Sequence, residues 1–130
     1  MYRFFNPNPC GRSVDDCAVR ALAAAFDVPW EQAYDVLSDS AKQMCDMPGS
    51  VGSVSAILRQ MGFVCEAIGD YMTVGEFADT HLKGVYVLGL GGHIVTVIDG
   101  VTLDSFDPSS EAIELVWYRD RERDRRVRNV

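Results

Sequence analysis

Two side chains in this 130-residue chain have the types expected of a thiol nucleophile and its general base. Cys17 falls in the first turn of a helix predicted over residues 15–26, where unpaired N–H groups and the helix dipole lower a thiol pKa. His93 follows the pair Gly91-Gly92 and opens a predicted strand, and histidine is the usual general base. The competing interpretations are a small buried cysteine and an ordinary strand histidine.

The turn that follows the histidine strand supplies a geometric test. Asp99-Gly100 is a strong signal for a two-residue hairpin turn, which fixes the register of the strands on either side. In that register Asp104 is the diagonal neighbour of His93 on the same face, within reach of a carboxylate–imidazole hydrogen bond. Asp107 is the alternative acid, but it falls on the other face and would need a bulge. The sequence thus predicts a Cys17–His93–Asp104 triad.

The elements that must position these residues fall into two groups. Helices come first, predicted over residues 15–26, 30–37 (continuing irregularly toward 44), 51–61 and 73–81, with one short strand over 63–68. Strands follow over 85–90, 93–98, 101–106 and 114–118, and the first dozen residues are expected to be irregular. This order indicates an α+β fold with one domain over 1–118 and a charged, frayed tail over 119–130.

Charge and cysteine content exclude several classes of function. A net charge of −7 argues against nucleic acid as the partner, and the arginines of the tail alternate with acids. No apolar run is long enough for a membrane span, and the start lacks a signal-peptide pattern, so a cytoplasmic location with reduced thiols is expected. The four cysteines form no CxxC pair and the two histidines are far apart, so neither a metal nor a cofactor is expected.

Two segments resemble a known family. GRSVDDCAVRA over 11–21 and GHIVTVIDG over 92–100 are similar to small papain-like proteins of bacteria and their phages, of the bacteriocin-processing-peptidase type. Asp104-Ser105-Phe106 resembles the family's Asn-Ser-Trp, where the amide orients the histidine and the aromatic ring covers that bond. The resemblance implies a papain-like fold, with N-terminal helices packed on a C-terminal antiparallel sheet, in a bacterium or a phage-infected host cell.

The sequence departs from the family pattern at two positions near the thiol. Asp15 adds a carboxylate beside Cys17, and a like charge raises a thiol pKa. The family places an oxyanion-hole glutamine six residues before the cysteine, where this chain has Gly11. The backbone N–H of Cys17 and the side chain of Asn8 are the donors that could replace it.

Two classes of function follow from these residues. The first is a cysteine hydrolase that cleaves a peptide or other amide bond through a thioester on Cys17, with acyl transfer from that thioester left open. The second is a catalytically weak or inactive papain-like module that binds a peptide or partner protein. In both classes the expected partner is a peptide or protein. The sequence does not identify the substrate or the oligomeric state.

Overall fold

The computed structural model describes residues 1–119 of the chain. They form β1 (Tyr2–Phe4), α1 (Cys17–Phe26), α2 (Trp30–Met44), α3 (Val51–Gln60), β2 (Phe63–Ala67), α4 (Val74–Thr80), β3 (Val85–Leu90), β4 (His93–Ile98), β5 (Val101–Asp104) and β6 (Ile113–Arg119). The α+β class is confirmed. The predicted strands over 85–90 and 93–98 have the observed boundaries, because each is a strongly apolar run ended by glycine or an Asp-Gly turn.

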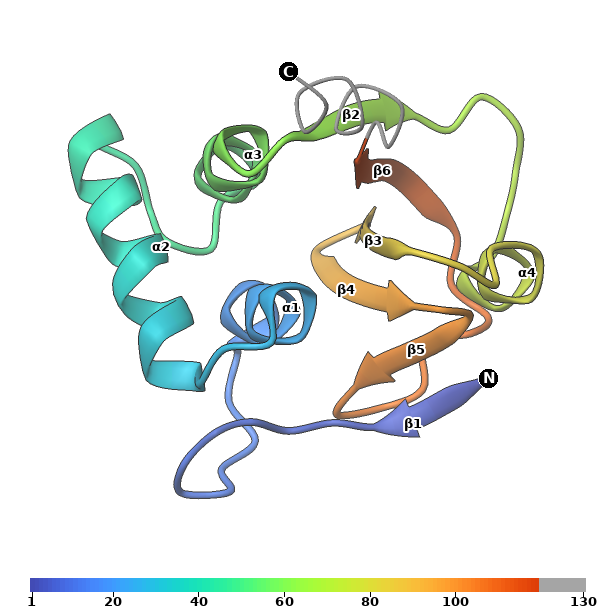
Figure 1. Ribbon diagram of the computed structural model, residues 1–130, viewed down its shortest axis with the longest axis horizontal. Helices are drawn as coiled ribbons and strands as arrows, with labels where there is room; N and C mark the ends of the chain where they lie inside the picture. The colour runs from blue at the N-terminus through green and yellow to red at the C-terminus, as the bar shows by residue number, and fades with distance from the viewer. Residues whose placement is uncertain (120–130) are drawn as a thin grey trace, which may run out of the picture.

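The strands make one sheet in the order β1-β5-β4-β3-β6-β2 (Figure 1). Four of the five strand pairs are antiparallel, but β1 runs parallel to β5, so the expectation of a purely antiparallel sheet is wrong. The expectation that the first dozen residues are irregular is also wrong for β1. Its three residues become a strand only through pairing with a strand about 100 residues further along the chain, which no local pattern reveals.

The helices divide between the two faces of the sheet. α1 packs on one face with α2 against it, α3 packs on α2 and β2 beside it, and α4 lies on the other face (Figure 1). Successive side chains along a strand point to opposite faces of the sheet, and here both faces are apolar. The core under α1 includes Val87, Ile94 and Trp117. The core under α4 includes their chain neighbours Leu88, Val95 and Val116. The sheet therefore has a packed core on each side.

Three predicted boundaries differ from those observed by two residues or more. α1 begins at Cys17 rather than residue 15, and Asp16 is its N-cap residue. α2 continues as a regular helix to Met44, because Leu37 and Ala41 bury one face of its second half. β5 ends at Asp104, two residues before the predicted end.

The last strand, β6, ends one residue later than the strand predicted over 114–118. Arg119 is the last residue of β6, where it pairs with Phe63 and its guanidinium lies 4.9 Å from the centre of that ring. The rest of the predicted tail, residues 120–130, lies outside the described part of the chain. Within residues 1–119, no helix is both long and apolar enough to cross a membrane.

Candidate active site

Cys17 is the first residue of α1, and the helix end around it has an unusual cap. Asp16 occupies the N-cap position, but its side chain accepts no hydrogen bond from the first-turn N–H groups. The positive end of the helix dipole therefore lies at the half-buried Cys17 without a carboxylate covering the backbone donors. Such an environment favours the thiolate form of a cysteine.

The structure brings His93 to this thiol. A hydrogen bond from His93 is the largest cause that lowers the pKa of Cys17, and it outweighs the opposing effect of burial. The backbone N–H of Ile94 also hydrogen-bonds to the sulfur, and the Asp15 carboxylate raises the pKa by the smallest of these effects. The predicted effect of Asp15 thus has the right sign, but the pKa of Cys17 is lowered overall.

Asp104 binds the opposite side of the His93 ring. His93 Nε2 lies 2.6 Å from Asp104 Oδ2, which leaves Nδ1 as the ring nitrogen for the thiol. Burial lowers the pKa of His93, but the hydrogen bonds to Asp104 and Cys17 outweigh it and raise the pKa to about 9. The lowered thiol pKa and the raised imidazole pKa both favour a thiolate beside an imidazolium.

The register that places Asp104 is the one predicted from the sequence. Asp99 and Gly100 both have positive φ, as a two-residue hairpin turn requires, and Ile98 pairs with Val101. Asp107 instead accepts hydrogen bonds from the backbone N–H and the hydroxyl of Ser109, in the turn after β5. The geometry therefore selects Asp104 over Asp107 as the partner of His93.

A buried ion network behind Asp104 was not predicted from the sequence. Arg20 Nε donates to Asp104 Oδ1 at 2.9 Å, and Arg20 Nη1 donates to Asp16 Oδ1 at 2.5 Å. The indole N–H of Trp30 donates to the other Asp16 oxygen at 2.8 Å. One signal was present in the sequence: Arg20 is the only charged residue of an otherwise apolar helix, and a buried charge needs a partner.

Two further elements support the triad. The Phe106 ring lies over His93 with the ring centres 4.8 Å apart, so this ring covers the imidazole. The N-terminal segment, β1 and the residue after it, holds the backbone of Asp104. The Phe5 N–H and the Tyr2 hydroxyl both donate to the Asp104 carbonyl oxygen. The N-terminal segment therefore belongs to the support of the site.

Asn8 has a structural role that was not predicted. Its side-chain oxygen accepts from the N–H groups of Cys10 and Arg12, which folds the loop before α1. Its role as an oxyanion donor stays a prediction. Gly11, at the position of the family's glutamine, has φ +64° and open space where a Cβ would lie.

The other cysteines and the second histidine lie elsewhere. Cys10 and Cys45 are exposed, and Cys65 is half-buried in β2 with its pKa raised by burial. His81 ends α4, where it stacks on Phe77 with ring centres 3.7 Å apart. In the described part of the chain, Cys17 is the thiol with a histidine partner.

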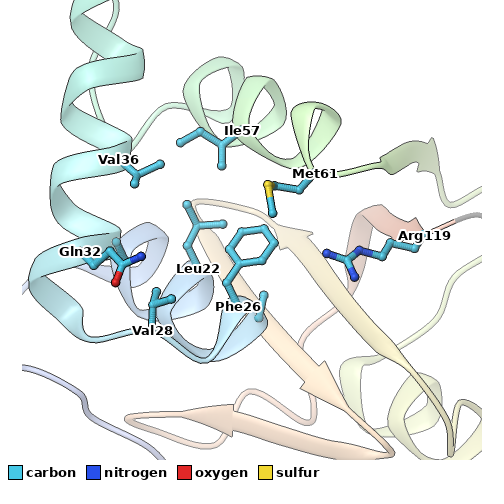
Figure 2. Close-up of a pocket in the computed structure, with 10 residues that line it drawn as sticks. Leu22, Phe26, Val28, Gln32, Val36, Ile57, Met61 and Arg119 are labelled. Carbon is cyan, nitrogen blue, oxygen red and sulfur yellow. The ribbon is translucent and has the colours of Figure 1, made fainter. Parts of the chain in front are cut away.

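A cavity of about 470 Å³ lies at the other end of α1, among α1, α2 and α3 (Figure 2). Its lining is mainly apolar, and Gln32 and Arg119 are the polar side chains that face it. Phe26 in this cavity is nine residues from Cys17, which is about 13 Å along a helix axis. With one charged group in its lining, this cavity has no acid–base pair of its own.

Comparisons of the chain with protein-family models, with curated proteins and with solved structures found no match. The assignment of chemistry to this chain therefore rests on the geometry of its own residues.

Proposed function

We propose that the chain is a papain-like cysteine hydrolase that cleaves a peptide or other amide bond. The observation that carries the proposal is the hydrogen-bonded series Cys17–His93–Asp104 at a helix N-terminus, with the thiol pKa lowered and the imidazole pKa raised to about 9. A nucleophile, a base bonded to it and a third group that orients the base form the arrangement required for covalent catalysis.

In the first half of the reaction, the Cys17 thiolate attacks the carbonyl carbon and a C–S bond forms. The His93 imidazolium then gives the proton on Nδ1 to the departing nitrogen as the C–N bond breaks, which releases an amine and leaves a thioester. Asp104 holds the ring through Nε2 during this transfer, so that Nδ1 stays directed at the sulfur and the leaving group.

In the second half, neutral His93 takes a proton from a water molecule whose oxygen attacks the thioester carbon. The C–S bond breaks, the acid product leaves, and the thiolate–imidazolium pair is restored. In both halves the negative charge on the carbonyl oxygen needs donors, and we assign the Cys17 N–H to this role. It lies at the start of α1, where no carboxylate cap competes for the backbone groups.

The competing hypothesis of an inactive binding module rests on Asp15 and on the missing glutamine. Asp15 is the weakest of the effects on the Cys17 pKa, so it is a poor reason to expect an inert thiol. Gly11 leaves open space rather than a blocking side chain at the position of the missing amide. These two observations favour the hydrolase over the binding module.

The test is covalent labelling with a peptidyl epoxide or vinyl sulfone, followed by intact-mass and peptide-mass measurement. One adduct on Cys17 is expected in the wild type and in Cys10→Ala, and none in Cys17→Ala or His93→Ala. An absence of adduct in wild-type protein whose exposed Cys10 still reacts with iodoacetamide would reject the hydrolase and favour the binding module.

A further inference from the structure

We propose that Arg20 is a positioning residue of this site: by binding Asp104 on the side away from His93, it holds the acid in the one orientation that can direct the imidazole. The inference rests on the proposed function of Cys17 and His93. It assigns a role to a residue that touches neither the thiol nor the imidazole in the described contacts.

Arg20 lies one turn into the helix that carries Cys17. Its side chain is 6% exposed, and its two hydrogen bonds come from different nitrogens, from Nε to Asp104 at 2.9 Å and from Nη1 to Asp16 at 2.5 Å. Because a guanidinium is a planar fork with several fixed donors, one side chain can hold two carboxylates at a set angle. The nucleophile and this fork are therefore carried by the same rigid helix.

Asp104 uses its two oxygens for different partners. Oδ1 accepts from Arg20 and from the backbone N–H of Ser105, while Oδ2 accepts from His93. A rotation of the carboxylate would break the contacts of both oxygens together. Arg20 thus determines which oxygen meets the imidazole and at what angle, whereas Ser105 alone could not balance the negative charge.

The charge of Arg20 is as necessary as its shape. Asp16 and Asp104 are both buried, and buried charges need a partner, which Arg20 supplies to both carboxylates. Without that pairing, Asp104 would be held less firmly beside the imidazole that bonds to Cys17. Trp30 completes the arrangement, because its indole N–H fixes the second Asp16 oxygen from α2.

Other titratable groups surround this network, and a pH profile has to allow for them. They are Cys17 and Asp15 at the start of α1, His93 on β4, Tyr2 on β1 and Asp107 after β5. The pKa of Tyr2 is raised by burial and by Asp104 and Asp107, so its hydroxyl stays neutral across the range in which the thiol is studied. When variants that differ only at Arg20 and Asp104 are compared, the contributions of these other groups to the pH profile cancel.

The experiment is a double-mutant cycle of Arg20→Met and Asp104→Asn, read as the pH profile of Cys17 alkylation by iodoacetamide. An amide at position 104 can accept from the ring and carries no charge, so it does not need the guanidinium. With Asp104 present, Arg20→Met should move the acid limb of the profile to higher pH, and alkylation below that limb should fall about 10-fold for each unit that the Cys17 pKa rises. In the Asp104→Asn background, the same change should have little effect.

Arg20→Lys covers the case in which Arg20→Met does not fold. Lysine keeps the charge but cannot contact both carboxylates as the fork does, so its profile should lie between wild type and Arg20→Met. Arg59→Met, which removes an exposed arginine from the last turn of α3, is the control and should match wild type.

Two outcomes would reject the proposal, and they differ from failure of the proposed function. Equal effects of Arg20→Met in the wild-type and Asp104→Asn backgrounds, with secondary structure intact by circular dichroism, would assign Arg20 to general structural support. An Arg20→Lys profile identical to wild type would show that a positive charge at this position suffices, and it would reject the role of the guanidinium fork in orienting Asp104. If wild-type Cys17 is alkylated no faster than Cys10, the hydrolase proposal itself is lost.

Discussion

The N-cap residues of α1 and α4 are Asp16 and Thr73, and both residue types are preferred at this position. The two side chains nevertheless bind different partners. Thr73 caps α4 in the usual way, accepting from the Glu76 N–H at 3.2 Å. Asp16 precedes α1 and leaves its amides uncapped, while its carboxylate binds Arg20 and Trp30. The capped end supports the stability of α4, and the uncapped end leaves backbone donors beside Cys17 for chemistry.

The largest expected effect comes from the acid that links the uncapped helix to His93. Asp104→Ala removes the hydrogen bond that raises the His93 pKa, so the imidazolium is lost near neutral pH and the Cys17 pKa rises. We expect alkylation of Cys17 at pH 7 to fall by roughly 100-fold or more, while Asp104→Asn causes a smaller loss because an amide still orients the ring.

Asp107→Ala is the matched control for that change. Asp107 bonds only within its own turn in the described contacts, so alkylation should stay close to wild type. Stopped-flow alkylation or quenched mass spectrometry measures all three variants. A larger loss in Asp107→Ala than in Asp104→Ala would contradict the assignment of the orienting acid.

The second prediction exchanges the two cap residues for alanine. Thr73→Ala should cost about 1 kcal/mol in the free energy of unfolding, as loss of a helix cap does, and leave Cys17 alkylation unchanged. Asp16→Ala breaks a buried ion pair and should cost about 3–5 kcal/mol. It should also slow alkylation, because Arg20 loses one of its two anchors. Denaturant unfolding and alkylation rates of the same samples give both quantities.

The third prediction concerns stability against pH. The His93 pKa is raised from 6.5 to about 9, so its stabilising contribution is complete below pH 6.5 and is lost as the pH rises through about 9. The Cys17 pKa is lowered from 9.0, so its contribution is complete above pH 9 and is lost as the pH falls through the lowered value. Between pH 6.5 and 9 the two changes oppose each other.

Cys17→Ser removes the contribution of the thiol to this pH dependence and leaves that of His93. The variant keeps the raised His93 pKa that Asp104 causes, and it should therefore lose stability relative to wild type as the pH rises from 6.5 to 9. Urea unfolding at several pH values tests this expectation. The contributions of all other titrating groups cancel in the difference between the unfolding free energies of the two proteins. A difference that stays constant with pH would mean that no thiolate–imidazolium pair exists in the folded protein.

The smallest effect is expected at Asp15, the acid outside the network. Asp15→Gly removes the charge that raises the Cys17 pKa, so the alkylation profile should move to lower pH. The shift should be small, since this is the weakest of the effects on the thiol. Asp15→Asn removes the same charge without adding a glycine and should match it. A profile that does not move would show that solvent screens Asp15 from the sulfur.

The sequence predicted the triad better than it predicted the support around it. The Asp99-Gly100 turn fixes a register, and register alone places Asp104 beside His93. The Asp16–Arg20 pair has the spacing of an ordinary exposed helix pair, and only its burial makes it part of the site.

Supports that come from distant segments were beyond local patterns. β1 joins β5 in parallel, and the donation from Phe5 to the Asp104 carbonyl depends on that pairing. The hydrogen-bond partner of Trp30 is likewise set by how α2 packs against α1. Hydrophobic period and turn signals do not encode such contacts.

The 84 residues that separate Arg20 from Asp104 have a consequence for how the protein is made. A ribosome releases α1 before β4 and β5, so the cysteine emerges earlier than the histidine and the acid that adjoin it in the fold. Contacts between such distant segments form late, after the intervening chain has closed. During synthesis Cys17 is thus an ordinary thiol, mostly protonated at neutral pH. Folding of the sheet then brings His93 to the thiol, and this contact lowers the pKa of Cys17.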